Sequence, residues 1–554
     1  MFEIRHPNRK ASSRKSVISR QSIGAKAPED IPIKTIDEVE LENKYKALLE
    51  SINLEGNYQK LQFLVMFLIS LSASVMIFTL PLQGRLPTYE CFSIENFKDY
   101  EMYLNDDKRY RVVENHMCVK EYCLPIMPES VDGNDLILVY DNYSVINWVT
   151  QLHVVCTHIS FFNDVGSYSF VGKIIIPTIL AYLADKIGRL KVFRINNTAL
   201  ILSFIFYYFY LSKTTAMIIS FLVMGLYYEL LLGYLMLPEY MTVPLGKNLV
   251  IFGMASYSFA GIIYTFVMYI FRDITIINLF VFIVFLVLEV IAFTFSIEPP
   301  KFLLHTKRYE EFEKATLIIA KFNNREAEYS CALERLDDYR NLTKSNKINI
   351  SEMNIHTHLL VNEKKISFIQ DLLGPYFILF GSKLILIIVL KLCIVFLAMN
   401  ILVFGFMLSV QQMKGDPYVN LMVYFIADMI AKLCGGFILK VVRTIDFLLV
   451  LFILSFIFNI GLIYFSQIEL VRMALIFGTC FTYSITFIVC FAYVTEIFDP
   501  SVKATAFIFL MGVGTMGLVF YGQMVEIFPT PFHLFTVVSF FPIIICYSLL
   551  DMVE

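Results

Sequence analysis

Long runs of apolar residues recur through most of this 554-residue chain. A helix needs roughly 20 predominantly apolar residues to cross the hydrocarbon core of a bilayer. Lipid offers no hydrogen-bond partner to an open strand, so such runs cross a membrane as helices. About twelve runs begin near Leu61, Phe161, Val192, Ala216, Asn248, Thr275, Ser382, Tyr418, Asp446, Arg472, Lys503 and Pro531. The sequence therefore predicts an all-α membrane protein with twelve transmembrane helices.

Two long polar connections divide these runs. The first, at about residues 83–160, follows the first run, and the second, at residues 298–381, separates six runs from six. We therefore expect an N-terminal tail at 1–59, a six-helix half at 60–297, a central loop at 298–381 and a second six-helix half at 382–554. Two packed six-helix halves are a common plan for secondary transporters.

Positive charges in the short connections predict the orientation of the chain. With a cytosolic tail, the cytosolic connections carry Lys186, Arg189, Lys191, Arg194, Lys247, Lys440, Arg443 and Lys503. Short cytosolic loops carry an excess of Lys and Arg. Both termini and the central loop are therefore predicted to be cytosolic, and the loop at 83–160 to be outside. Within the central loop, residues 302–345 are expected to form one or two amphipathic helices.

The outside loop carries signals typical of an oxidising compartment. Its four cysteines, which allow three disulfide pairings, are Cys91, Cys118, Cys123 and Cys156. The tripeptide Asn142-Tyr143-Ser144 is an N-glycosylation acceptor. Both signals agree with the orientation that the positive charges predict.

A charged connection joins the second and third runs. It reads AYLADKIGRLKV, from Ala181 to Val192, and resembles the G-x-L-A-D-x-x-G-R motif of the major facilitator superfamily. The resemblance implies that Asp185, Gly188 and Arg189 form a conformational latch between the halves. A carboxylate gains energy at a helix N-terminus, and glycine permits a tight turn. Ala181 replaces the first glycine of the motif.

Four further segments resemble the organic cation/anion transporters of that superfamily. They are WVTQLHVVC (148–156), LPEYMTVPLGK (237–247), EPPKFLLHTKRYEEFEKA (298–315) and YVTEIFDPSVKA (493–504). By this resemblance the latch also includes Glu239, Lys247, Glu298, Glu496 and Lys503. Sugar porters share several of these motifs, but LHVVC and the cysteine-bearing loop favour the organic-ion branch. The family implies a location in the plasma membrane.

The chain also departs from the family pattern. The second-half copy of the first motif is reduced to VVRTID, from Val441 to Asp446. The arginine often found early in the fourth helix falls at about Phe221. At the position in the eleventh helix where family members carry an acid or an arginine, this chain has Thr515. The clearest charge determinant of the family is therefore missing.

Ionisable residues inside the runs are candidates for function, because a charge within a bilayer is costly unless it faces a cavity or a partner. Asp428 and Lys432 lie four residues apart and share a helix face, while Glu229 and Lys391 lie deep in their runs. Aromatic residues that can line a cavity and stack on organic cations are Tyr257, Tyr264, Phe404 and Tyr483. For Asp164 and Lys173 we expect structural positions, with Lys173 extending toward the outer surface.

Together these features predict a secondary active or facilitative transporter of small organic solutes that works by alternating access. Asp428 and Glu229 favour cations or zwitterions as the solute. A sugar porter and a non-transporting scaffold or receptor are the two alternatives. We find no P-loop and no paired Cys or His metal spacing, so we expect no enzyme activity, no cofactor and no metal. A net charge of −3 gives no sign of a nucleic-acid partner. The expected partners are the solute and the lipid bilayer, and the expected state is a monomer.

Overall fold

The structure is a computed structural model of the chain. It describes residues 36–83, 89–93, 112–113, 136–140, 147–152, 154, 158–209, 212–226, 236–351, 380–381, 383–410, 413–438, 443–498 and 500–553. Within these ranges, the side chains of Asp185, Lys247 and Lys503 are among those that lie outside the description.

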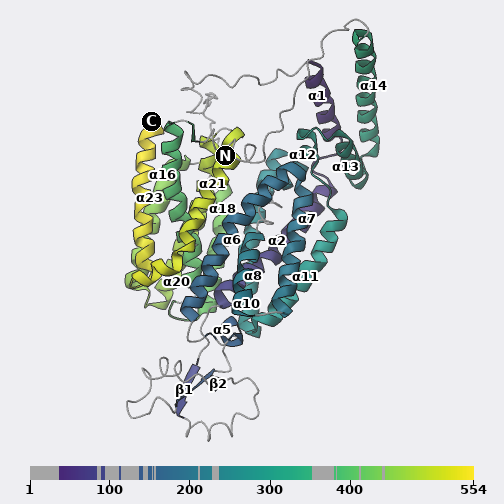
Figure 1. Ribbon diagram of the computed structural model, residues 1–554. Helices are drawn as coiled ribbons and strands as arrows, with labels where there is room; N and C mark the ends of the chain where they lie inside the picture. The colour runs from purple at the N-terminus through teal and green to yellow at the C-terminus, as the bar shows by residue number, and fades with distance from the viewer. Residues whose placement is uncertain are drawn as a thin grey trace, which may run out of the picture.

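Two groups of long helices stand side by side and make up the bundle (Figure 1). The first half contains α2 (Asn57–Gln83), α6 (His158–Ile187), α7 (Arg189–Phe209), α8 (Lys213–Leu226), α10 (Val243–Phe271) and α11 (Ile274–Phe295). The second half contains α16 (Lys383–Asn400), which continues through the π-helix η4 (Ile401–Gly405) into α17 (Phe406–Val410), and then α18 (Pro417–Ile438), α19 (Thr444–Phe465), α20 (Glu469–Ile497), α21 (Pro500–Val519), α22 (Tyr521–Ile527) and α23 (Pro531–Val553). The prediction of an all-α membrane protein with two six-helix halves is confirmed.

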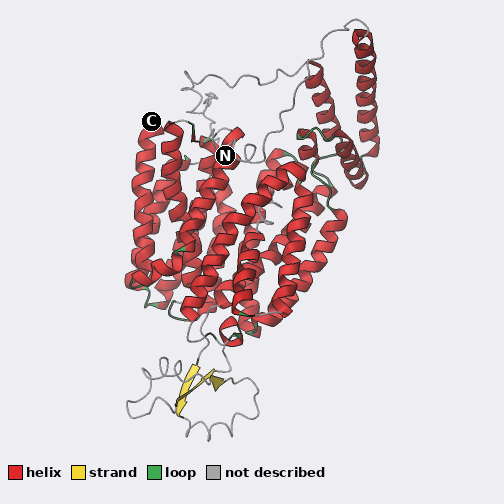
Figure 2. Ribbon diagram, viewed as in Figure 1, coloured by secondary structure: helices red, strands yellow, loops and turns green. Residues whose placement is uncertain are grey.

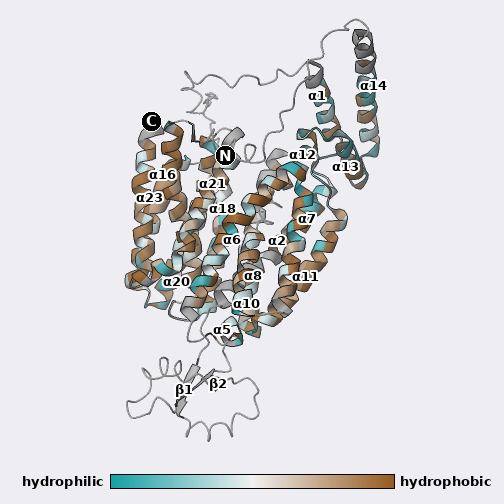
Figure 3. Cartoon of the chain, viewed as in Figure 1, coloured by the Kyte–Doolittle hydropathy of each residue, from teal (hydrophilic) through white to brown (hydrophobic). Residues whose placement is uncertain are grey.

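Most helices of the bundle have the length and composition of a membrane span. Among the described residues, eight helical segments are long and apolar enough to cross a bilayer, and two shorter apolar helices lie at Lys213–Leu226 and Thr505–Val519. Figure 3 shows hydrophobic residues along the bundle and more hydrophilic residues on the helices beyond its end. The remaining two predicted spans correspond to α2 and α7, and α7 begins with the cations Arg189, Lys191 and Arg194.

Two pairs of helices join the halves. One pair is α10 and α18, and the other is α6 and α21. The Ser167 hydroxyl on α6 donates a hydrogen bond to the Val519 carbonyl at the end of α21 (2.7 Å). The rings of Tyr269 on α10 and Tyr418 on α18 lie edge to face, with centroids 5.8 Å apart. The halves are therefore held together both by backbone contacts and by side chains.

A small antiparallel sheet lies beyond one end of the bundle (Figure 2). Its strands β1 (Tyr89–Ser93), β2 (Val112–Val113) and β3 (Leu136–Tyr140) are arranged in the order β1-β3-β2. The sequence prediction treated this region only as a loop, because such short strands leave a weak pattern. Cys91 lies in β1 opposite Leu138, whereas Cys118, Cys123, Cys156 and Asn142 lie outside the described residues. The disulfides and the glycosylation site therefore stay predictions.

Four helices form a separate group at the opposite end of the bundle (Figure 1). They are α1 (Ile36–Ser51), α12 (Pro300–His305), α13 (Tyr309–Phe322) and α14 (Glu326–Ser351). α1 packs on α14, with Leu48 and Ile52 fully buried. The Tyr45 phenol donates to Glu313 on α13 (3.2 Å), and Arg340 on α14 bonds to both residues. Burial raises the pKa of Tyr45 to about 12, so its phenol keeps the proton that it donates.

Asn323, just after α13, joins this group to the start of the bundle. Its side-chain oxygen accepts from the backbone amide of Tyr58 on α2 (2.8 Å). Its side-chain nitrogen donates to the Ile52 carbonyl (2.9 Å) and to the Gln59 side chain (3.1 Å). One amide therefore fixes the connection between α1 and α2 against the central loop.

Asn323→Ala should loosen α1 from α13 and α14. The substitution leaves the Tyr58 amide and the Ile52 carbonyl without their partner, and an unsatisfied buried polar group costs about 1–3 kcal/mol. We expect faster hydrogen exchange in residues 40–52, measured by mass spectrometry on the purified protein. Exchange in α18 serves as the internal control and should not change. Unchanged exchange in residues 40–52 would show that apolar burial alone holds α1.

α6 and α8 approach each other closely at Gly172. A Cβ atom added there would overlap the backbone carbonyl of Phe221. On α8, a Cβ atom on Gly225 would in turn lie 2.8 Å from the Gly172 carbonyl. Small residues at helix contacts let membrane helices approach closely. The two glycines therefore set the spacing between these two helices.

Gly172→Ala should destabilise the first half, because the methyl group would force α6 and α8 apart. Overpacking of this kind typically costs about 1–3 kcal/mol, which thermal unfolding in detergent would detect as a lower Tm. Gly166 on the same helix is the matched control, since an added Cβ there meets no described atom within 4 Å. Gly166→Ala should leave the Tm unchanged or raise it. Equal Tm values for the two variants would contradict the close contact.

Candidate functional site

A tight turn joins α6 to α7. α6 ends at Ile187 and α7 begins at Arg189, so Gly188 alone reverses the chain. Its φ of 122° lies in a region that L-residues with a side chain rarely adopt. A Cβ atom at Gly188 would also lie 3.1 Å from a carboxylate oxygen of Glu298. Glycine is therefore required both by the backbone and by the neighbouring acid.

Glu298 caps the start of α7. One carboxylate oxygen accepts from the backbone amides of Arg189 (2.5 Å) and Leu190 (3.3 Å), which have no partner within the helix. Burial raises the pKa of the Glu298 carboxyl above its ordinary value, and the two amide hydrogen bonds lower it in part. The cap links the connection after α11 to the turn before α7.

Arg189 brings a third connection to this turn. Its Nε lies 3.0 Å from a carboxylate oxygen of Glu239, in the connection between α8 and α10. Its guanidinium lies 5.1 Å from the centre of the Phe302 ring. The structure therefore brings together four predicted latch residues, which we call the turn network: Gly188, Arg189, Glu239 and Glu298. The latch roles of Asp185, Lys247 and Lys503 depend on side chains outside the description and stay predictions.

The corresponding turn of the second half has different side-chain contacts. Arg443 forms an ion pair with Asp446 on its own helix (2.6 Å). Glu496 accepts a hydrogen bond from the Thr444 hydroxyl at the start of α19. A neutral donor thus stands where the first half uses Arg189, in agreement with the eroded second motif in the sequence.

A buried ion pair lies at mid-length of α18, between the two halves. Asp428 has only 3% of its surface exposed, and one of its carboxylate oxygens lies 2.7 Å from Nζ of Lys432. The same oxygen accepts from the Ser258 hydroxyl on α10 (2.6 Å). The other oxygen accepts from the Ser484 hydroxyl on α20. Three donors therefore satisfy one carboxylate, and one of them comes from the opposite half.

The ammonium of Lys432 contacts the first half as well. It donates to the Ser258 hydroxyl (3.1 Å) and lies 4.5 Å from the centre of the Tyr257 ring. The Tyr257 hydroxyl contacts the sulfur of Met407 on α17 (3.7 Å). We call this set the interface cluster: Tyr257, Ser258, Asp428, Lys432 and Ser484.

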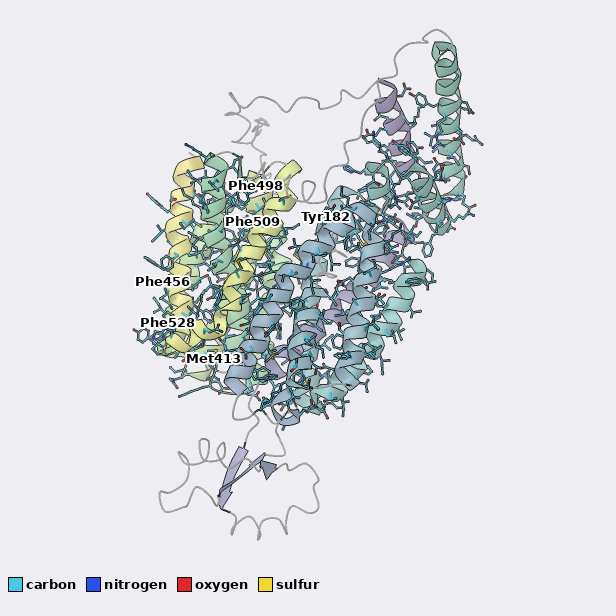
Figure 4. All side chains as sticks on the ribbon, in the orientation of Figure 1. Tyr182, Met413, Phe456, Phe498, Phe509 and Phe528 are labelled. Atoms are coloured by element: carbon cyan, nitrogen blue, oxygen red, sulfur yellow. The ribbon has the colours of Figure 1, made fainter. Side chains whose placement is uncertain are left out.

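In Figure 4, Met413 and Phe528 mark one end of the second half, and Phe498 and Phe509 mark the other.

Three predicted site residues form hydrogen bonds within the second half. Lys391 on α16 donates to the Ser548 carbonyl on α23 (3.1 Å), and Tyr483 donates to Asn459 on α19 (2.7 Å). Thr515 donates to the Met511 carbonyl of its own helix (2.8 Å). We therefore do not place these three residues in the interface cluster.

The remaining predicted positions differ among themselves. Tyr264 is buried in the core that α10 shares with the second half. Asp164 is exposed on α6, and Glu229 lies outside the described residues. Lys173 does not extend to the outer surface as expected: it lies at mid-length of α6, with Nζ 3.6 Å from the centre of the Phe404 ring.

Three polar residues that form hydrogen bonds between helices were not identified from the sequence: Ser258, Ser484 and Glu289. Ser258 and Ser484 carry no charge, and serine is common in membrane helices. Their only signal is that each lies near mid-length of its apolar run, at the depth of Asp428. Glu289 on α11, which accepts from Asn197 on α7, was detectable as a single acid within an apolar run.

Glu298→Ala should destabilise the protein, because it removes the cap of α7. Loss of an N-terminal cap typically costs about 0.5–2 kcal/mol, measured as a lower Tm in detergent. Glu298→Gln keeps one acceptor oxygen, so its Tm should fall less than that of Glu298→Ala. Equal losses in the two variants would show that the charge, rather than the hydrogen bonds, stabilises the turn.

Comparison with known proteins agrees with this architecture. No curated protein matches the sequence. The structure is similar to the proton:xylose symporter XylE bound to 6-bromo-6-deoxy-D-glucose, with a TM-score of 0.52 and 11% identity over 92% of this chain and 96% of that chain. It is also similar to XylE from E. coli in a partially occluded inward-open conformation (TM-score 0.55, 10% identity, 90% and 100% covered) and in an inward-open conformation (0.53, 10%, 89% and 96%). Residues 137–522, more than half of the chain, match the Major Facilitator Superfamily. The chain belongs to the major facilitator superfamily of membrane transporters.

Proposed function

We propose that this chain moves small organic ions across the plasma membrane, and that it binds them between its halves at the depth of the interface cluster. Members of the superfamily are transmembrane transporters that work by alternating access. The finer assignment, to organic ions, is supported by the motifs shared with organic cation/anion transporters. It is also supported by the charged side chains at the centre of the bundle.

The observation that carries the proposal is the Asp428–Lys432 pair with its bond to Ser258. Ionised groups within a membrane are costly to keep, and they mark solute pathways and coupling sites. A scaffold without transport would not need an ion pair at these positions, since replacing a buried ion pair by well-packed apolar side chains is often neutral or stabilising. An ion pair at the contact between the halves therefore favours a transporter.

The contacts between the halves suggest which state the structure represents. Ser167 with Val519, and Tyr269 with Tyr418, join the halves toward the end that carries the sheet. The Arg189–Glu239 ion pair, at the end that carries α12–α14, lies within the first half. We propose that this state is open toward α12–α14, the end that the positive charges in the connections predict to be cytosolic.

A sugar porter is the second candidate. The similar structures are of a proton:xylose symporter, but an identity of 10–11% supports the fold alone. A neutral sugar is recognised through hydrogen bonds to its hydroxyl groups. Ser258 and Ser484 can form such bonds, yet both are already bonded to Asp428. The described cluster therefore favours a charged solute.

Purified protein in lipid vesicles tests the proposal directly. Initial uptake rates are measured for organic cations, organic anions and sugars, with and without a membrane potential. Saturable uptake of an ion whose rate depends on the potential supports the proposal, and uptake confined to sugars favours the second candidate. If folded protein takes up no solute, the scaffold alternative is favoured.

Asp428→Asn should lower the initial uptake rate at least 10-fold, because it leaves the Lys432 ammonium without its counter-charge. Asp446→Asn is the matched control: it breaks an ion pair at the start of α19 and should change the rate less than twofold. The double variant Asp428→Asn with Lys432→Met removes both charges and should regain thermal stability without regaining uptake. Recovery of uptake in the double variant would assign the pair a structural role only.

A further inference from the structure

Lys173 occupies the second contact between the halves, on the side opposite the interface cluster. It lies at mid-length of α6 and extends toward η4 of the other half, where the Phe404 ring faces its ammonium at 3.6 Å. Phe170, Met224 and Leu518 form a buried apolar cluster against which Phe404 also packs. The ammonium is therefore set in a largely apolar contact between the halves.

Among the described residues, no carboxylate lies within ion-pairing distance (4.0 Å) of the Lys173 ammonium. An aromatic ring attracts a cation, but it leaves the three N–H donors of the ammonium without an oxygen acceptor. A lysine within a membrane normally pairs or faces a water-filled cavity. Both Lys173 and Phe404 keep part of their surface exposed.

The described acid nearest in depth to Lys173 is Asp428, and its carboxylate already accepts several hydrogen bonds. Asp428 holds Lys432 and accepts from two serines, so it offers little to a cationic solute. With Lys173, the described residues at mid-depth between the halves carry two positive charges and one negative charge. The surplus charge is positive, which reverses the preference for cations that the sequence suggested.

The backbone that presents Phe404 is irregular in a way that often marks function. Residues Ile401–Gly405 form a π-helix, and single π-helical turns within α-helices occur frequently at functional sites. The Gly405 carbonyl accepts from the Tyr521 hydroxyl on α22 (2.9 Å). This bond holds the irregular turn in place, and with it the ring beneath the ammonium.

We propose that Lys173 binds the carboxylate of the transported solute, with Phe404 against its body, so that the substrate class is the aromatic monocarboxylates. This inference rests on the proposed transport function. A single ammonium matches one carboxylate better than a phosphate, which attracts several donors. Phe404, which keeps part of its surface exposed, suits an apolar, aromatic body rather than a polyhydroxyl one.

Vesicles with the full-length protein test the proposal with matched probes. Benzoate, phenylacetate and nicotinate are compared with their neutral amides and with benzylamine. We expect saturable uptake of at least one carboxylate and at least a 10-fold lower rate for its amide. Lys173→Gln should lower carboxylate uptake at least 10-fold, and Lys173→Arg should keep more of it. Lys414→Gln, at the far end of the second half, should change the rate less than twofold.

Thermal stability separates binding from folding. Lys173→Met removes a charge that has no counter-ion in the described part of the chain, so its Tm should equal or exceed that of the wild type while carboxylate uptake is lost. A lowered Tm together with lost uptake would assign Lys173 to packing and overturn the proposal. Glu229→Gln tests a rival partner: a loss of carboxylate uptake equal to that in Lys173→Gln would assign Lys173 to an ion pair.

The outcomes also separate this proposal from the proposed function. Carboxylate uptake that is unchanged in Lys173→Gln, or uptake confined to amides or benzylamine, would overturn the carboxylate site and leave a transporter. Absence of uptake of every probe and of the wider solute panel by folded protein would overturn both.

Discussion

A carboxylate in the middle of a membrane protein must be satisfied by the protein itself, and Asp428 imposes that constraint on three helices. Its donors come from α18, α10 and α20, so the relative position of these helices is fixed by one buried charge. Because Ser258 belongs to the other half, any rocking of the halves must keep or break a charge-assisted hydrogen bond. Such bonds are about twice as strong as neutral ones, which makes this contact a natural point of control.

The turn network, in contrast, acts within the first half. Glu298, Arg189 and Glu239 come from three connections of the same half, and Asn323 adds α1 and the central loop to that half. These bonds join the first half and its helical group to each other. The corresponding turn of the second half depends on the neutral Thr444. The two halves therefore differ in how firmly their helix ends are fixed.

The sequence predicted what lipid and local spacing dictate. Apolar runs predicted the spans because about 20 apolar residues cross a bilayer as a helix, and the four-residue spacing of Asp428 and Lys432 predicted that they share a helix face. Arg189, Glu239 and Glu298 were identified by motif. Ser258, Ser484 and the Lys173–Phe404 contact were not, because such pairs depend on how distant helices rotate against each other. Depth within a run does not say which neighbour a side chain faces, and the described bond of Lys391 goes to Ser548 on α23.

The sign of the charge between the halves follows from contacts rather than from composition. Asp428 looks like a site for cations when the sequence is considered alone. Once Lys432, Ser258 and Ser484 take up its oxygens, the acid has little left to offer a solute. Lys173 contributes an ammonium whose described neighbour is an aromatic ring, and a ring attracts a cation without neutralising it. An anion that enters between the halves would supply that missing charge and lower the cost of keeping Lys173 ionised, so binding of the anion and the approach of the halves at α6 and η4 would favour each other.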